Sequence, residues 1–476
     1  MERHPLALEG YAARRPEFRT VVSPFDREPL FEVEHAAEDA LDHALETARR
    51  VQDTLWRETP AWQRAAWLDA AADRVRADGE ALARLIAAEG GKPLKDARVE
   101  ASRAAVTLEE CARAALRLEG HAVGMERAPG TENRLAFTLR EPIGVVLAIS
   151  AFNHPLNLCC HQAGAALAAG NTCILKPASS TPRSAIRLGA ILRECGLPEG
   201  VLQIVPTPGR RAAHLVASPA VDFITFIGSA EVGWAIRRQA ADGTRLAAEH
   251  GGNAASIVLA DADLDHAVPL IVRGAFYHAG QVCVSTQRLY VEHTIEPELT
   301  ARLVAAAAAL RCGDPRDAAT DVGPLIEPAE VRRVHAWVDE ARAAGAEVLA
   351  GGAPLSETVY GTTVLRGAPE EAKVIAEEVF GPVVTVQPVA SLAEAIAKVN
   401  RSTNPFQSSI FTRDVDRAFQ AAREVASSAF LINDFTAFRV DWMPFGGRKH
   451  AGLGLGGVDH GVLDMTEEKL IVINAR

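Results

Sequence analysis

From residue 143 onward, short apolar runs alternate with stretches of helical periodicity, and this alternation limits the possible folds more than anything else in the chain. Runs that are apolar along their whole length are typical of parallel strands covered by helices on both faces. The pattern predicts an α/β fold, in which ligands bind beyond the carboxyl ends of the strands. The strand-like runs lie at residues 143–149, 172–175, 202–205, 223–226 and 245–248.

The flanking regions extend this architecture. Residues 36–118 have apolar positions at helical spacing, and residues 120–140 are rich in turn formers, which suits a β-hairpin. A second α/β series is expected over residues 256–431, and residues 469–473 are typical of a terminal strand.

Charge and cysteine usage restrict the classes of partner. The formal net charge of −11 argues against nucleic acid as the main partner. The N-terminal residues lack the apolar core of a signal peptide, and no run suits a membrane span, so we expect a soluble, cytoplasmic protein. The cysteines number 7 and include no CxxC pair, which favours neither a disulfide framework nor a metal site.

Two residue types could carry covalent chemistry. Cys283 lies in a Gly-Gln-Val-Cys segment after a predicted helix, where a thiolate could be presented on a loop. A buried apolar cysteine is the alternative. Glu249 follows a predicted strand and precedes two glycines, so its carboxylate could act as an acid or base at a strand end. An exposed loop carboxylate is the alternative there.

Other residues suggest a phosphate or ribose site. Lys176 ends a predicted strand, and Gly228-Ser229 opens a predicted helix whose amides could bind a pyrophosphate. A solvated lysine and an ordinary N-capped turn are the alternatives. The glycine-rich residues 452–457 do not follow a strand within a βαβ unit, so we reject them as a dinucleotide fingerprint and expect a loop.

Seven motifs stand in a fixed order along nearly the whole chain. They are Phe152-Asn-His-Pro155, Lys176-Pro177, Phe226-Ile-Gly-Ser229, Glu249-His-Gly-Gly252, Gly280-Gln-Val-Cys283, Glu377-Glu-Val-Phe-Gly-Pro382 and Pro444-Phe-Gly-Gly447.

This ordered set resembles the aldehyde dehydrogenase superfamily. The resemblance implies that Cys283 attacks an aldehyde to give a thiohemiacetal, that Asn153 and the Cys283 amide stabilise its oxyanion, and that hydride transfer leaves a thioester. Glu249 would then activate the water that releases the acid. No metal is implied.

The resemblance also implies a cofactor, NAD(P), and a three-part fold. Lys176 would hold the adenosine ribose, Gly228 and Ser229 the pyrophosphate, and Glu378 with Phe380 the nicotinamide ribose and ring. The three implied parts are a Rossmann-like cofactor domain (1–118 and 141–250), an α/β catalytic domain (251–444) and a β bridging element (119–140 and 465–476). Pairing of strands between subunits would then give a homodimer or homotetramer.

Three departures from the family pattern bear on specificity. Ser179 stands where NAD-preferring members often carry Glu, so the 2′-phosphate of NADP meets no repulsion and we expect NADP to be accepted. His250 replaces the usual apolar residue after the base, where it could tune Glu249 or simply pack. Phe152 stands where many members have Trp, which changes the lining of the aldehyde channel.

The substrate is expected to be a small polar or anionic aldehyde. His154 adds a polar group beside Asn153, and Arg103 matches a position where some subfamilies bind an anion. Arg439 precedes the Pro-Phe-Gly-Gly loop and could contribute a second cation. Alternatively, both arginines pair with acids such as Glu100 or Asp441.

Rival functions can be compared on the same residues. A CoA-acylating aldehyde dehydrogenase generally lacks the base, so Glu249 argues against it. A cofactor-independent thioester or ester hydrolase could use Cys283 and Glu249 without redox chemistry. A catalytically inactive scaffold would normally have lost Cys283, Asn153 or Glu249, and all three are present.

Overall fold

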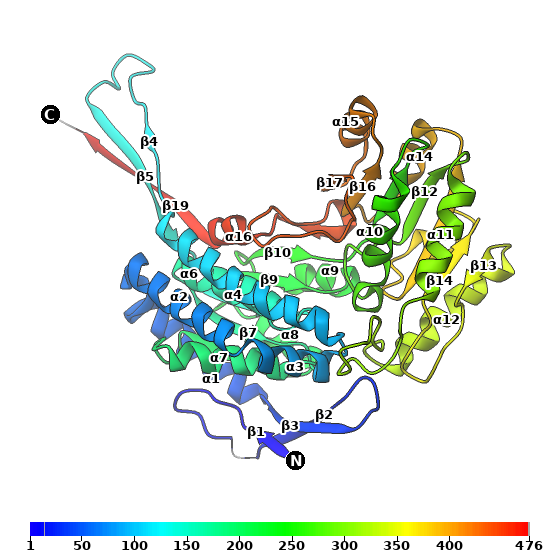
Figure 1. The fold of residues 1–476 in the computed structure, drawn as a ribbon. Coiled ribbons are helices and arrows are strands. Elements are labelled where there is room, and N and C mark those ends of the chain that lie inside the picture. The colour runs from blue at the N-terminus through cyan, green and yellow to red at the C-terminus, as the bar shows by residue number, and fades with distance from the viewer. Residues whose placement is uncertain (14, 475–476) are drawn as a thin grey trace.

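The computed structural model describes residues 1–13 and 15–474 (Figure 1). The parts of the expected segments 1–118 and 465–476 that fall on residues 14, 475 and 476 lie outside the described residues. The described chain builds two large sheets, each flanked by helices, and two small three-stranded sheets at its periphery.

The first large sheet has six strands in the order β18-β10-β9-β6-β7-β8. Neighbouring strands of this sheet run parallel to each other, except that β18 runs antiparallel to β10. The segment 452–457, expected only as a loop, therefore also adds a short edge strand. The strands are β6 (Val145–Ile149), β7 (Thr172–Lys176), β8 (Leu202–Ile204), β9 (Phe223–Ile227), β10 (Arg245–Glu249) and β18 (Gly452–Leu453).

Helices cover both faces of this sheet because successive strand residues point to opposite sides. Val145 packs in a core with α1 and α8, whereas Val146 packs with α2, α4, α6 and α7. The helices around this sheet are α1 (Glu38–Thr54), η1 (Trp56–Glu58), α2 (Ala61–Ala77), α3 (Gly79–Gly90), α4 (Leu94–Leu116), α7 (Pro182–Glu194), α8 (Gly209–Val216), α9 (Ala230–Gln239), η4 (Lys449–Ala451) and α16 (Val458–Asp464).

An interrupted helix lies between β6 and β7. It consists of α5 (Asn157–Cys159), a π-helical turn η2 (Cys160–Gly164) and α6 (Ala165–Ala169). Single π-turns of this kind occur frequently at functional sites. Here the turn lies beside the segment that carries Asn153.

The second large sheet has seven strands in the order β13-β14-β15-β12-β11-β16-β17, and only the β13–β14 pair is antiparallel. One face packs against α10, α11 and α12, and the other against α14 and α15. The elements are β11 (Ala255–Val258), α10 (Leu264–Phe276), η3 (Tyr277–Gly280), β12 (Arg288–Glu292), α11 (Glu296–Ala308), α12 (Pro328–Ala343), β13 (Glu347–Ala350), β14 (Thr363–Arg366), α13 (Lys373–Ala376), β15 (Val383–Val389), α14 (Leu392–Val399), β16 (Gln407–Phe411), α15 (Val415–Glu424) and β17 (Ala429–Ile432).

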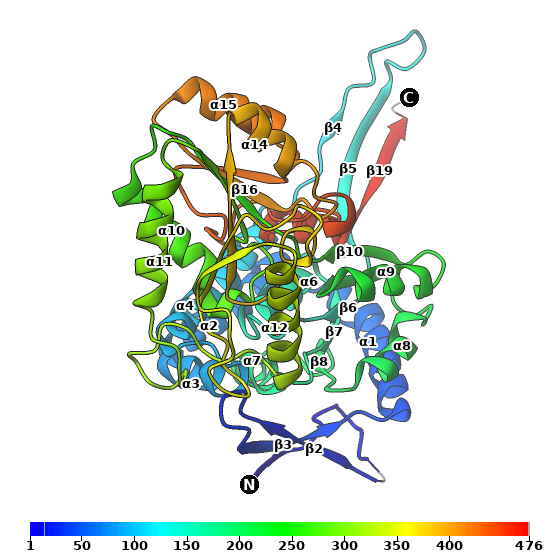
Figure 2. The same ribbon diagram turned by 90° about the vertical axis from the view of Figure 1, so that its right-hand side faces the viewer.

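Two peripheral sheets complete the fold. A long arm, formed by β4 (Ala122–Val123), β5 (Arg134–Pro142) and β19 (Thr466–Asn474), projects away from the body (Figures 1 and 2). A second sheet of β1 (Glu2–His4), β2 (Glu17–Val22) and β3 (Pro29–His35) lies at the opposite end of the molecule and was not expected from the sequence. Among the described residues, no helix is long and apolar enough to cross a bilayer.

Candidate active site

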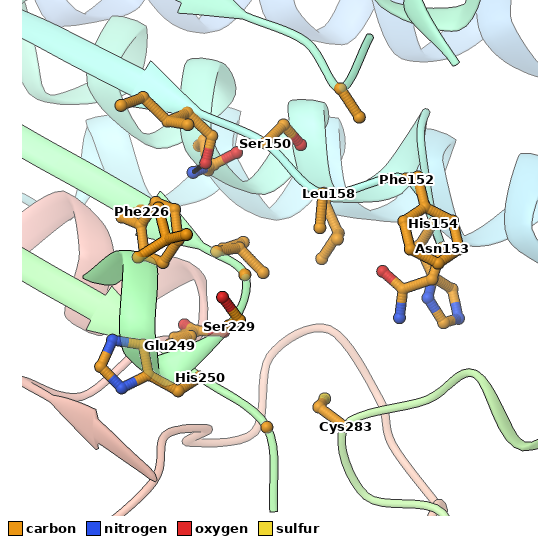
Figure 3. Close-up of a pocket in the computed structure, with 18 of the residues that line it drawn as sticks. Ser150, Phe152, Asn153, His154, Leu158, Phe226, Ser229, Glu249, His250 and Cys283 are labelled. Atoms are coloured by element: carbon orange, nitrogen blue, oxygen red, sulfur yellow. Dashed lines mark hydrogen bonds between the residues drawn. The ribbon is translucent and has the colours of Figure 1, made fainter. Parts of the chain in front are cut away.

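A cavity of about 1300 Å³ lies where the ends of the parallel strands of the first sheet face the loops of the second (Figure 3). Residues from β6, β7, β9 and β10 line it on one side, and the segment after η3 lines it on the other. All of the nominated residues border this one space: Arg103, Asn153, His154, Lys176, Ser179, Gly228, Ser229, Glu249, Cys283, Glu378, Phe380 and Arg439.

Cys283 is presented by a sharply bent segment. His278 and Ala279 have left-handed backbones, with φ of 48° and 55°, and Gly280 follows at 71°. A Cβ on Gly280 would lie 2.1 Å from the carbonyl oxygen of Gly381, so only glycine fits there. The Cys283 thiol lines the cavity, so it is not the inert, fully enclosed cysteine of the alternative interpretation.

The Cys283 thiol is held in its protonated form. Burial raises the pKa of Cys283 well above its ordinary value, and the negative charges of Glu378 and Glu249 raise it further. Only the thiolate is a good nucleophile, so a nucleophilic role of this thiol would require a base in the cavity that accepts its proton.

Glu249, at the end of β10, has the properties of such a base. Burial raises its pKa to about 7, and the nearby Arg439 cation opposes that rise. A Cβ on Gly456 would lie 1.8 Å from Glu249 Oε1, so the carboxylate occupies space that a side chain at 456 would fill. A carboxylate that titrates near neutrality can both take and release a proton at physiological pH.

Asn153 is buried beside the cysteine loop. Its Nδ2 donates a 3.0 Å hydrogen bond to the carbonyl oxygen of Gln281, two residues before Cys283. The following turn is fixed by Glu100, whose Oε1 accepts hydrogen bonds from the amides of Leu156 (3.0 Å) and Asn157 (3.2 Å). The Asn153 amide is therefore held close to the position where a carbonyl oxygen on Cys283 would develop charge.

Glu100 belongs to a buried ion pair that the sequence did not reveal. Its other carboxylate oxygen bonds Lys92, and both side chains are almost completely enclosed. Lys92 lies in the Gly-Gly-Lys-Pro segment between α3 and α4. No local signal distinguishes such a lysine from a solvated one.

The opposite end of the cavity fits a dinucleotide. Lys176 is 8% exposed, and its side-chain ammonium group has no hydrogen-bond or carboxylate partner within residues 1–13 and 15–474. Burial lowers its pKa to about 8, so a bound phosphate or ribose would supply the missing partner. Ser229 precedes α9 without capping it through its side chain, which leaves the first α9 amides available for a pyrophosphate.

Ser179 lies at this end of the cavity and is exposed. Its hydroxyl places no negative charge where a 2′-phosphate would bind. Arg210, at the start of α8, also lines the cavity here and was not nominated from the sequence. An exposed arginine at a helix start gives no local signal by which it could have been found.

Glu378 and Phe380 line the cavity between the end that contains Cys283 and the end that contains Lys176. A Cβ on Gly251 would be 1.9 Å from Glu378 Oε2, and the Gly252 amide donates to Oε1 at 3.2 Å, so the glycine pair makes room for this carboxylate. Burial raises the pKa of Glu378 to about 8. The ring of Phe380 meets Phe152 edge-to-face at 5.9 Å.

The two nominated arginines differ in their partners. Arg103 is bound on two sides by Asp441, with Nη2–Oδ1 of 2.7 Å and Nε–Oδ2 of 3.1 Å, so the ion-pair alternative is correct for Arg103. Arg439 stacks on the ring of Phe445, its guanidinium carbon 3.7 Å from the ring centroid, and its buried Nη1 has no hydrogen-bond partner. Burial lowers the pKa of Arg439 to about 10, so it remains a cation at neutral pH.

The two nominated histidines are uncharged. Burial lowers the pKa of His154 well below its usual value, and its Nε2 lies 3.4 Å from the hydroxyl of Tyr277. His250 packs against Trp234, with ring centroids 5.1 Å apart, and its Nδ1 bonds the carbonyl oxygen of His450 at 2.9 Å. Its ring thus fills a gap beside α9, which favours the packing interpretation.

Together, the doubly wound sheet, the dinucleotide-sized cavity and the Cys283–Glu249 pair define a dinucleotide-dependent oxidoreductase. Comparison with known proteins gives the particular group. Residues 11–471 match the model of the Aldehyde dehydrogenase family, and the chain belongs to this family.

Relatives and solved structures agree with this assignment. The chain is 39% identical to 3-sulfolactaldehyde dehydrogenase of Priestia aryabhattai, covering 100% of this chain and 98% of the relative. It is 38% identical to aspartate-semialdehyde dehydrogenase 1 of Pseudomonas canavaninivorans, over 95% of this chain and 96% of the relative. Aldehyde dehydrogenase 21 from Physcomitrella patens, solved with succinate, superposes with a TM-score of 0.96 at 32% identity, covering 100% and 98% of the two chains.

A second solved structure brings the cofactor into the comparison. NADP-dependent glyceraldehyde-3-phosphate dehydrogenase from Bacillus halodurans, solved with NADP, has a TM-score of 0.96 at 32% identity and covers 100% of each chain. The protein is accordingly an NAD(P)-dependent aldehyde dehydrogenase that oxidises small aldehydes to carboxylic acids.

Proposed function

We propose that the substrate is a small aldehyde that carries a negative charge. The observation that carries this proposal is Arg439, a cation in the cavity whose Nη1 is buried without a partner and whose charge acts on both Glu249 and Cys283. A buried unpaired cation is costly, and an anionic substrate would supply the missing hydrogen bonds.

The names of related proteins support a substrate that carries an acid group. The Priestia relative is named for a sulfonated aldehyde, and the Pseudomonas relative for aspartate semialdehyde. The two solved structures described above concern succinate and glyceraldehyde 3-phosphate. All four compounds carry an acid group that is ionised at neutral pH, although aspartate semialdehyde also carries an ammonium group.

In the proposed mechanism, the Cys283 sulfur attacks the aldehyde carbon while Glu249 accepts the thiol proton. The side-chain amide of Asn153 releases the Gln281 carbonyl and, with the Cys283 amide, donates to the developing oxyanion. Donors of this type contribute about 10²–10³ in rate. Bound NAD(P)⁺ supplies the hydride acceptor, and loss of hydride from the substrate carbon leaves a thioester on Cys283.

Release of the acid is assigned to Glu249. Glu249 first releases the thiol proton to solvent. Its carboxylate then takes a proton from water, the resulting hydroxide adds to the thioester, and Glu249 returns this proton to the Cys283 sulfur as it leaves. A base at this position makes water the acyl acceptor, which separates this proposal from a CoA-acylating enzyme. The cofactor requirement of the family separates it from a simple hydrolase.

Cofactor binding is assigned to the opposite end of the cavity. Lys176 would bond the adenosine ribose, Gly228 and Ser229 the pyrophosphate, and Glu378 with Phe380 the nicotinamide ribose and ring. Because Ser179 bears no charge, NADP is accepted as well as NAD. The neighbouring Arg210 adds a cation on that side.

The proposal is tested by measuring initial rates of aldehyde oxidation through the absorbance of the reduced cofactor, with NAD⁺ and NADP⁺ in separate assays. Succinate semialdehyde and sulfoacetaldehyde are compared with neutral butanal and propanal. The expected result is a kcat/KM for the anionic aldehydes at least about tenfold above that for the neutral ones. Equal or better turnover of the neutral aldehydes would contradict the proposal.

We further propose that the protein is a cytoplasmic homodimer or homotetramer that assembles through the β4–β5–β19 arm. The support is a set of apolar side chains left exposed on the two faces of the arm, including Leu135 (59%) on β5 and Leu470 (57%) and Val472 (47%) on the edge strand β19. Exposed apolar side chains on an edge strand are typical of subunit contacts. Analytical ultracentrifugation should find a dimer or tetramer, and Leu470→Asp should shift it towards the monomer. A monomeric wild type would refute the assembly.

A further inference from the structure

Asp441 is the centre of a buried hydrogen-bond cluster beside the substrate end of the cavity. Its side chain is 2% exposed and lies on the loop that carries Arg439. It accepts bonds from Arg103 (2.7 and 3.1 Å), from Asn157 Nδ2 (3.0 Å) and from His161 Nε2 (2.9 Å). The Asp441 carboxylate thus joins α4, α5 and η2 to the loop that carries Arg439, which lies two residues before Asp441.

Asp441 is ionised. Burial alone would raise its pKa, but the bonds from His161 and Arg103 hold the pKa well below its usual range. Burial lowers the pKa of His161, so that ring is neutral at physiological pH. The negative charge of Asp441 therefore cancels the positive charge of Arg103.

The remaining cations around this end differ in their surroundings. Lys92 forms its ion pair with Glu100. Arg273 on α10 is exposed and lies over the ring of Phe435, its guanidinium carbon 5.6 Å from the ring centroid. His154 is neutral. Among the described residues, Arg439 is the one cation lining this part of the cavity with a buried guanidinium nitrogen that has no hydrogen-bond partner.

We propose that Asp441 is a positioning residue that sets the charge selectivity of the substrate site: by cancelling Arg103, it leaves Arg439 as the unmatched buried cation that faces the substrate, and the site then selects monoanionic aldehydes over dianionic ones. Carboxylates and sulfonates are in the first group, and phosphates and phosphonates in the second. This inference rests on the proposed function, namely that the substrate is anionic.

The physical basis is the high cost of an uncompensated charge in a buried site. A monoanion that meets Arg439 leaves no charge unmatched. A dianion brings a second negative charge, and the two carboxylates whose charges act on the Cys283 thiol, Glu249 and Glu378, would repel it. With Asp441 neutralised, Arg103 would become free to match that second charge.

The test uses three probes of similar size: sulfoacetaldehyde, phosphonoacetaldehyde and neutral propanal, at about pH 8.5, where the phosphonate is mainly dianionic. The wild type is expected to favour the sulfonate over the phosphonate by about tenfold or more in kcat/KM. Asp441→Asn is expected to raise the phosphonate-to-sulfonate ratio by about tenfold, since Arg103 is then unmatched. A general structural defect would lower both rates without moving this ratio.

The double variant Arg103→Gln/Asp441→Asn is the matched control. It removes the pair together and is expected to return the ratio to the wild-type value. Should Asp441→Asn fail to fold, Arg103→Gln gives the complementary result: Asp441 then opposes Arg439, and both anionic probes should lose about tenfold relative to propanal. Melting curves establish that each variant compared is folded.

The outcomes separate the two proposals. A wild type that turns over propanal as well as the anionic probes refutes the proposed function itself. A wild type that favours both anions equally over propanal, or an Asp441→Asn ratio unchanged from wild type, leaves the proposed function intact and overturns the role of Asp441.

Discussion

Replacement of Arg439 by methionine tests how the cavity recognises its substrate. Methionine keeps much of the length of the arginine stem and its contact with Phe445, but removes the charge and all of the donors. A charge-assisted hydrogen bond contributes about 1.5–3 kcal/mol, and a planar guanidinium commonly makes two to a carboxylate or sulfonate. A net loss of about 3 kcal/mol corresponds to a fall of roughly 10²-fold in kcat/KM for anionic aldehydes.

Neutral aldehydes provide the internal comparison. They make no ion pair with Arg439, so kcat/KM for butanal is expected to change by less than about threefold. The variant is also expected to raise the pKa of Glu249, because the Arg439 charge holds that pKa down. Rates are therefore compared at about pH 8.5, where Glu249 is deprotonated in both proteins.

Arg439→Lys is the matched conservative variant, since it keeps a positive charge but loses the planar fork. An intermediate loss for anionic aldehydes is expected. If Arg439→Met slows anionic and neutral aldehydes by the same factor, the arginine has a structural role, and the assignment of an anionic substrate loses its main support.

Three further variants address the reaction and the cofactor. Cys283→Ala should abolish aldehyde oxidation while cofactor binding, followed by protein fluorescence, persists; full activity in this variant would exclude the covalent mechanism. The kcat of the wild type should fall as pH drops through about 7, because Glu249 acts in its deprotonated form, and Glu249→Gln should lose this limb of the profile together with most of the turnover. An unchanged profile would remove Glu249 as the base. Ser179→Glu should lower kcat/KM with NADP⁺ by at least about tenfold relative to NAD⁺, through repulsion of the 2′-phosphate, and an unaltered ratio would contradict the assignment of that position.

Much of the fold follows from local patterns. The strand predicted over residues 172–175 has its expected position within a residue, because a fully apolar run leaves few alternatives. Strand β18 and the sheet β1–β3 were not expected. Each is short or lies at an edge, where pairing depends on a distant partner such as β10.

The candidate site could be predicted from the sequence to a similar degree. Strand ends and family motifs nominated Cys283, Glu249 and Asn153, and all three border one cavity. The partner of Arg103 could not be decided, since Asp441 lies 338 residues away in the chain. The π-turn over residues 160–164 could not be predicted either, because its local sequence has ordinary helical character.

The most direct measurement is the identification of the acyl intermediate. Glu249→Gln is mixed with an anionic aldehyde and NADP⁺, the reduced cofactor is followed by stopped-flow absorbance, and the quenched protein is digested and weighed by mass spectrometry. The expected result is formation of about one equivalent of reduced cofactor per site and no further turnover, with the acyl group on the peptide that contains Cys283. This single turnover is slow, because Glu249 is also the base that accepts the thiol proton. Reduced cofactor formed without acylated Cys283, or an acyl group on another residue, would contradict covalent catalysis by this cysteine.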